Sequence, residues 1–358
     1  MLPLCSQAEA ARWLPRIEPE LITWRRLAFT HPDLVLAALG TALAGPRALR
    51  PWVWARRAPA LAILARTHPD ALLDIAEASL GEDPLPAPLA AVLGHLARAP
   101  GGADRVVAWL VHPARAGALR RGGVPPSLLP VLPRLPSALV DALAREVAEN
   151  PNGLAVLLGA LPPGRRAVVF QAAVPAPDAQ RWPDALMEVL PHALRATEAR
   201  RQLALKAIAE DADARLAMTA WLPIEEARPT LEAAARGSQA EDRAQALALL
   251  VRCTGRSRRG LDATLMTLRR LRNEQDPVRL AALGALAQIP MAALADAHVD
   301  DLDGLVTAVV EARDTSYGTR RALLDLARRC LLARATTPSR RSSGSACAPW
   351  SVWPPRRA

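Results

Sequence analysis

The sequence predicts an all-α protein built as an α-solenoid, a stack of two-helix repeats. Hydrophobic residues make up 51% of the 358 residues, but aromatic residues only 3%. Ala- and Leu-rich segments of this kind favour helices, and the β-branched and aromatic runs that mark strands are missing. Amphipathic segments also recur in pairs at a spacing of about 40 residues, which is the period of helical repeat proteins.

The clearest repeats lie between residues 182 and 333. In 272–290, RNEQDPVRLAALGALAQIP, we expect Asp276 to cap a helix, Pro277 to occupy its first turn and Pro290 to end it. Arginines recur at the equivalent place of four such helices: Arg201, Arg243, Arg279 and Arg320. Another amphipathic segment precedes each helix, at 182–194, 224–235, 260–271 and 300–312. Four helical hairpins are therefore expected here.

The segment DPVRLAALGALAQI (276–289) resembles the second helix of the HEAT-repeat family, including its bilin-lyase HEAT-like members. The resemblance implies that the repeated arginines form a structural ladder with acids of adjacent repeats, for which Asp242, Asp276 and Asp314 are the nearest partners. An inward row of arginines that binds an acidic ligand is the alternative. Bilin lyases and alkylpurine DNA glycosylases are HEAT-like enzymes, but no catalytic residue of either can be matched here.

The sequence Thr-His-Pro-Asp occurs twice, at 30–33 and 67–70. A residue before proline is driven out of the helical region, proline suits the first helical turn, and a following Asp complements the positive helix end. The motif therefore predicts two helix starts. A metal site of His31, Asp33, His68 and Asp70 is the weaker alternative, because no spacing typical of metal ligands accompanies it. We expect no metal and no cofactor.

The N-terminal half follows the repeat less regularly. Helices are expected at 20–29, 33–44, 58–66, 69–80, 87–98, 103–111, 136–149, 153–160 and 165–174. Residues 112–136 contain five prolines after position 124 and are expected to form an exposed loop or a junction. We therefore divide the chain into irregular repeats (1–135), HEAT-like repeats (136–333) and a disordered basic tail (334–358).

The net charge of +10 suggests nucleic acid as a partner, but its distribution argues against this. The tail 334–358 holds five arginines and no acid, and so carries half of the net charge. Lys206 is the only lysine among 45 basic residues, as in GC-rich coding sequences. Nucleic acid is therefore kept as an alternative partner and is not favoured.

Two short segments are candidate binding patches. RALRPWVWARR (47–57) interleaves tryptophan with arginine, which can stack on bases or bind phosphates. RCTGRSRRG (252–260) gathers arginines with no acid between them. The alternatives, which we favour, are tryptophans packed between repeats and an ordinary solvated turn. The candidate residues are Trp52, Trp54, Arg56, Arg57, Arg256, Arg258 and Arg259.

No motif for catalysis, nucleotide binding or metal binding is present, and the four cysteines are far apart. No secretion signal and no apolar stretch long enough to span a membrane is recognised. We therefore expect a non-catalytic, cytoplasmic bacterial scaffold that binds a protein partner through one face of the solenoid. A HEAT-like nucleic-acid-binding or DNA-repair protein is the alternative.

Overall fold

The computed structural model describes residues 2–17, 22–81, 83–175 and 181–336. Within these residues the chain forms helices, turns and loops and no strand, which confirms the predicted all-α class. The chain is organised as two compact units, Met1–Leu194 and Arg195–Ala358.

Unit 1 consists of short and medium helices joined by short connections. Its helices are α1 (Gln7–Trp13), α2 (Trp24–Thr30), α3 (Pro32–Leu43), α4 (Arg50–Thr67), α5 (Pro69–Leu80), α6 (Ala87–Ala90), α7 (Leu93–Leu96), α8 (Gly102–Leu110), α9 (Pro113–Gly122), α10 (Ser137–Val147), α11 (Pro151–Gly159), α12 (Pro163–Ala173) and α13 (Asp184–Val189).

Unit 2 begins within α14 and contains the longest helices. Its helices are α14 (His192–Leu203), α15 (Lys206–Ala209), α16 (Ala212–Thr219), α17 (Ile224–Ala234), α18 (Ala240–Ser257), α19 (Leu261–Leu268), α20 (Asp276–Leu286), α21 (Val299–Val310) and α22 (Tyr317–Thr336). Between α19 and α20 lies the 3-10 helix η6 (Arg269–Asn273).

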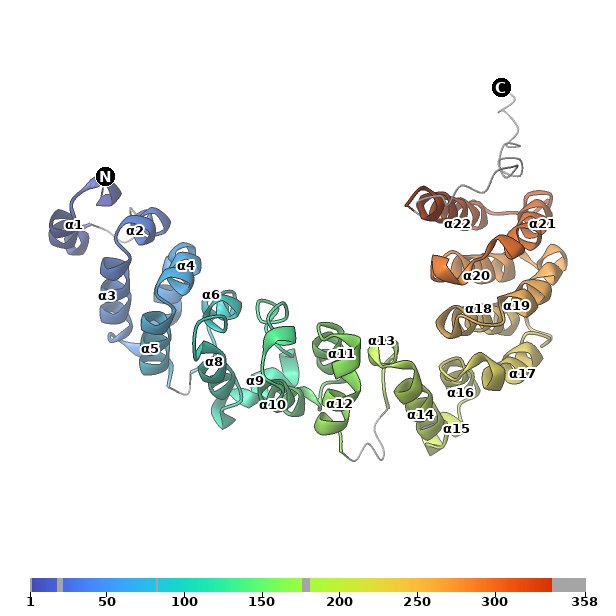
Figure 1. Cartoon of the computed structure of the whole chain (residues 1–358), viewed down its shortest axis with the longest axis horizontal. Coiled ribbons are helices and arrows are strands. Elements are labelled where there is room, and N and C mark those ends of the chain that lie inside the picture. Colours follow the sequence, from blue (N-terminus) through green and yellow to red (C-terminus); the bar gives the residue numbers. More distant parts are fainter. Residues whose placement is uncertain (1, 18–21, 82, 176–180, 337–358) are drawn as a thin grey trace, which may run out of the picture. The chain divides into compact units, whose positions relative to one another are not determined.

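The helices of each unit pack against near neighbours in the sequence (Figure 1). In unit 1, helices α3, α5, α8, α10 and α12 contact one another in succession, while α4 covers α2, α6 and α7, and α11 lies between α9 and α13. In unit 2, α20 packs between α18 and α22, while α21 contacts α19 and η6. The apolar core of unit 2 lies between these helices and includes Leu247, Leu265, Leu283 and Leu305, each at most 5% exposed.

Prolines start many of the helices, as the Thr-His-Pro-Asp motif predicts. His31 and His68 have nearly the same non-helical backbone, with φ of −136° and −140° and ψ of 63° and 56°, and the helices α3 and α5 begin at the prolines that follow. Each histidine carbonyl accepts the first helical hydrogen bond of its helix. The motif is therefore a helix start. Asp276 differs from expectation: it is the first residue of α20, and Gln275 occupies the cap position.

Residues 112–136 are not an exposed loop, so this first of the two expectations for the segment was wrong. Residues Pro113–Gly122 form α9, and the proline-rich segment after it buries Leu128, Val131 and Leu132 to 2% exposure or less. The Ser127 hydroxyl donates a 2.5 Å hydrogen bond to the carbonyl of Ala90. The prolines prevent a regular helix after α9, but the apolar side chains between them are still buried against neighbouring helices.

The boundaries of the units also differ from the proposed division at residue 135. Helix α10 packs on α8 and α9 as well as on α12, so the chain continues through this point without a break in packing. The compact units instead divide between Leu194 and Arg195. The helix α22 continues to Thr336, and the rest of the predicted disordered tail, 337–358, lies outside the described residues.

Gly94 tests the packing of the proline-rich segment. A Cβ atom at this position would lie 2.0 Å from the carbonyl oxygen of Ser127, so Gly94→Ala must displace that backbone. We expect Gly94→Ala to lower the free energy of unfolding by about 1–3 kcal/mol, as overpacking does. Gly164→Ala, where no atom lies within 4 Å, is the control and should be neutral or slightly stabilising. Urea unfolding followed by circular dichroism measures both, and equal stabilities would contradict the packing described.

Candidate functional site

Arg279 is the most buried of the four repeated arginines, with 2% exposure. Its guanidinium donates to the carbonyl of Glu274 at 2.6 Å and to the carboxylate of Asp314 in the next hairpin. Asp276 does not cap its own helix but accepts hydrogen bonds from the Ser316 amide and the Thr319 hydroxyl, at 3.0 and 2.8 Å. Both contacts join α20 to the start of α22.

Arg243 joins α18 to the following hairpin in the same way. Its Nη2 atom lies 2.9 Å from a carboxylate oxygen of Glu274, to which Arg270 also donates at 2.8 Å. Burial raises the pKa of Glu274, but the hydrogen bonds from the two arginines outweigh it and hold the pKa below its usual value near 4.5. The partner of Arg243 is thus Glu274 rather than the expected Asp242.

The other two repeated arginines lie in different surroundings. Arg201 pairs with Glu198 of its own helix at 2.8 Å. Arg320 is exposed on α22 and forms no ion pair with another residue in the described part of the chain. At the repeated position, Arg243 and Arg279 therefore link α18 and α20 to later segments, whereas Arg320 of α22 is exposed.

Three further arginines share the role of Arg243 and Arg279. In each case the third or fourth residue of a helix donates to a carbonyl five or six residues earlier, where the preceding helix ends. The distances are 2.6–3.3 Å, and the added pairs are Arg115 to Trp109, Arg166 to Leu161 and Arg215 to Ala209. A Pro-x-Arg pattern (HPAR at 112–115, DPVR at 276–279) is the sequence signal that could have identified Arg115.

The N-terminal candidate patch is divided between the surface and the core. Trp54 is fully buried whereas Trp52 is 47% exposed. Arg57 is 6% exposed and stacks on the ring of Trp24 at 4.5 Å, and burial lowers the pKa of its guanidinium. Its Nε and Nη1 atoms have no hydrogen-bond partner. Arg56 is half-buried, so these side chains do not form one exposed surface.

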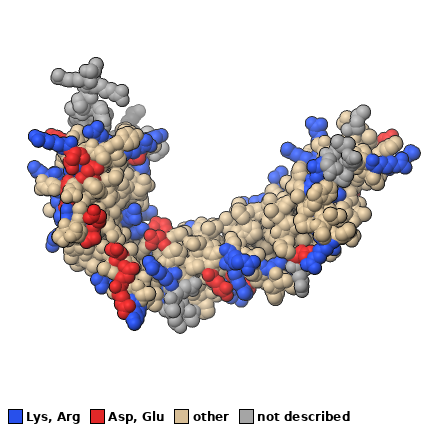
Figure 2. Space-filling model, turned by 180° about the vertical axis from the view of Figure 1, so that it is seen from behind, with Lys and Arg blue, Asp and Glu red and all other residues tan. Residues whose placement is uncertain are grey.

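The second candidate patch is also partly used inside the protein. The Arg256 guanidinium lies 3.5 Å from the centre of the buried Trp221 ring. Arg258 and Arg259 are exposed, and Arg258 ends α18 in the left-handed conformation with φ of 53°. Basic and acidic side chains both occur on the face of each unit seen in Figure 2, so neither unit presents a surface of one sign there.

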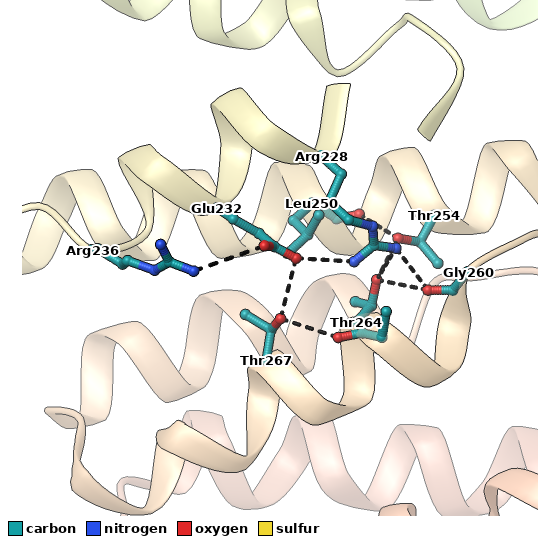
Figure 3. A network of polar contacts seen from close by, with 9 residues as sticks. Arg228, Glu232, Arg236, Leu250, Thr254, Gly260, Thr264 and Thr267 are labelled. Atoms are coloured by element: carbon teal, nitrogen blue, oxygen red, sulfur yellow. Dashed lines mark hydrogen bonds and ion pairs between the residues drawn. The ribbon is translucent and has the colours of Figure 1, made fainter. Parts of the chain in front are cut away.

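The polar network beside this turn connects α17, α18 and α19 (Figure 3). Arg228 donates to Glu232 at 3.1 Å, to the Gly260 carbonyl at 2.8 Å and to the Thr264 hydroxyl at 3.2 Å. Thr264 in turn shares a buried 2.8 Å hydrogen bond with Thr254 of α18. These groups satisfy one another, so the network contributes to the packing of the three helices.

The remaining reactive groups do not assemble into a centre. His68 lies 3.5 Å from Asp33, and His31 contacts the carbonyl of Cys5 at 3.1 Å. In the described ranges no three or more His, Cys, Asp or Glu side chains are grouped as a metal site would require. Burial raises the pKa of the Cys253 thiol to about 11, so it stays protonated near neutral pH.

One surface that we did not predict is an apolar row on α22. Tyr317, Leu324 and Leu331 are 79%, 53% and 61% exposed and are spaced by seven residues. Arg320, Arg321 and Arg328 flank this row and are exposed as well. We call these six residues the outer face of α22. The heptad spacing was present in the sequence, but only the structure shows that the opposite face of this helix is the buried one.

Comparisons with known proteins give no assignment. No family model matches the chain, and neither curated proteins nor solved structures match it significantly. In the part of the chain that the structure describes, no helix combines the length and apolar character needed to cross a bilayer.

The lowered pKa of Glu274 predicts how the stability of the protein depends on pH. A carboxyl whose pKa is lowered on folding stabilises the protein above its unfolded pKa, near 4.5, and this contribution is lost as the pH falls through the folded value. Glu274→Gln should lower stability at neutral pH by roughly 2 kcal/mol and flatten the loss below pH 4.5. Urea titrations from neutral to acidic pH test this. Glu241→Gln, on the exposed side of α18, controls for the lost charge, and an unchanged acid slope in Glu274→Gln would contradict the prediction.

Substitution of arginine by methionine is expected to affect thermal stability in opposite ways at Arg57 and at Arg243. Arg57→Met removes a buried charge that has no acceptor, so we expect unchanged or higher thermal stability despite the lost contact with Trp24. Arg243→Met removes one of the two arginines that bind the buried Glu274 and takes the side-chain donor from the carbonyls of Gly237 and Ser238, and should cost roughly 3 kcal/mol. Thermal unfolding of both variants gives the comparison. A loss in Arg57→Met as large as that in Arg243→Met would show that Arg57 has a partner.

Proposed function

We propose that the chain is a non-catalytic α-solenoid of the HEAT type that acts as a scaffold and binds a protein partner. The support for the solenoid is the succession of helices that pack on near neighbours, joined by first-turn arginines. A scaffold needs surface rather than chemistry, and stacked repeats provide a long surface.

The observation that carries the proposal is the outer face of α22. Large apolar side chains exposed singly are ordinary, but a row of three along one helix indicates a surface that another helix covers. Tyr317, Leu324 and Leu331 lie on one side of α22, while Leu323 and Leu326 on the other side are buried against α20. The exposed row has the composition of a helix interface.

The test of the scaffold proposal is direct. The full chain is cross-linked in the cells that express it, purified and treated with nuclease. We expect a protein partner that remains bound in a fixed ratio after nuclease treatment. Recovery of nucleic acid alone, or loss of every partner on nuclease treatment, would count against a protein-binding scaffold.

Arg258 and Arg259 support nucleic acid as the second candidate, because both are exposed at the end of α18. We expect the full chain to bind labelled single-stranded and duplex DNA only weakly near physiological salt, and Arg258→Ala/Arg259→Ala to leave this binding unchanged. Fluorescence anisotropy at about 50 mM and about 200 mM salt measures it. Tight binding that salt weakens steeply and that the double variant abolishes would replace the scaffold with a nucleic-acid function.

A further inference from the structure

The orientation of α22 is fixed at both ends by contacts with the preceding hairpin. At its start, Asp276 accepts hydrogen bonds from the Ser316 amide and the Thr319 hydroxyl. Further along, Arg329 donates to the carbonyl of Ile289 at 3.0 Å. Between them, Leu323 and Leu326 are buried to 7% and 2% exposure. The helix therefore cannot turn its apolar outer row inward, and this row is a fixed feature of the surface.

The outer row repeats every seven residues, which is the interval at which one of the two apolar positions of a coiled coil recurs. Residues seven apart lie two turns apart on nearly the same line of a helix, so Tyr317, Leu324 and Leu331 form a row with a repeat of about 10 Å. Arg320 and Arg328, four residues before and after Leu324, lie one on each side of it. A narrow apolar row between charged flanks, widened only at its end by the exposed Leu332, suits another helix. A bilayer surface calls for a broader apolar face.

The charges on the flanks decide what kind of helix fits. Arg321 is paired with Asp325 at 3.4 Å, but Arg320 and Arg328 form no ion pair with any residue of the described ranges. A second copy of α22 would bring arginine flanks together, and residues 337–358 contain four arginines and no acid. Like charges across a contact are unfavourable. Neither a second copy of α22 nor the segment 337–358 is therefore a favoured partner for this face. A helix with acidic flanks is complementary.

We propose that the outer face of α22 is a docking site for an acidic amphipathic helix of another protein. Leucine-like side chains of that helix pack on Tyr317, Leu324 and Leu331, and its Asp or Glu residues pair with Arg320 and Arg328. This inference rests on the proposed scaffold function and names the chemistry of its partner.

The test uses the full chain and two synthetic three-heptad peptides. Both carry Leu at positions a and d. One has Glu at e and g, where like charges suppress self-pairing, and the other has Lys. Tyr317 is the only tyrosine of the chain, so fluorotyrosine labelling places a single ¹⁹F resonance on the outer face. We expect the acidic peptide to bind and shift this resonance, and the basic peptide to do neither.

Three variants localise the binding. Leu324→Gln should weaken the acidic peptide by about tenfold or more, as loss of a central apolar contact does. Arg320→Glu/Arg328→Glu should reverse the preference towards the basic peptide. Met266→Gln, which changes a 62% exposed side chain of α19, is the matched control and should bind like the wild type. All these side chains are exposed, and circular dichroism checks that each variant is folded.

Several outcomes would overturn the proposal. One is equal or absent binding of the two peptides, and another is binding that neither the ¹⁹F resonance nor the variants report. Self-association of the peptide-free chain that Leu324→Gln abolishes would assign the face to a second copy. A resonance shift caused by phosphatidylglycerol vesicles would assign it to a lipid surface. If the peptides fail while cross-linking still yields a protein partner, the scaffold function stands and only this site is wrong.

Discussion

The arrangement of the helices depends on arginine side chains that bind the backbone where one helix ends and the next begins. The last carbonyls of a helix lack partners within that helix, and a junction packed against neighbours limits their access to water. From the first turn of the following helix, Arg115 donates to such a carbonyl, that of Trp109 in α8, while Arg166, Arg243 and Arg279 donate to carbonyls just past the end of the preceding helix. Since each guanidinium has five donors, its remaining ones also reach the adjacent hairpin. One side chain thus sets both the turn and the stacking.

This use of arginine explains why a very basic composition does not give a uniformly basic surface. The guanidinium groups of Arg243 and Arg279 are directed at Glu274 and Asp314, and Arg256 lies on the ring of Trp221. Arg57 is the exception, because it is buried on Trp24 with donors that have no acceptor. Its stacking on an aromatic ring provides the only compensation seen for the loss of water.

The outer face of α22 follows from the same construction. The helices α18 and α20 each have further helices packed on them, and Leu247, Leu283 and Leu286 are buried there. On α22 the equivalent arginine, Arg320, is exposed, and an apolar row runs beside it. The position that in α18 and α20 contacts a later segment of the chain is thereby placed at the surface of α22, where Arg320 provides the charge that the proposed docking site requires.

The sequence alone determined the helical class, the helix starts at His31-Pro32 and His68-Pro69, and the placement of Arg243 and Arg279 at equivalent helix positions. These features depend on steric rules and periodicities that act within a few residues. Only the tertiary structure decided which side chains meet across 30 to 40 residues: Asp276 with Ser316 and Arg243 with Glu274. It also decided that Trp54 is buried while Trp52 is half-exposed. The same holds for the proline-rich segment after α9, whose leucines Leu128 and Leu132 are buried in the core. Such partners depend on how hairpins pack, and a local pattern allows several packings of the same helices.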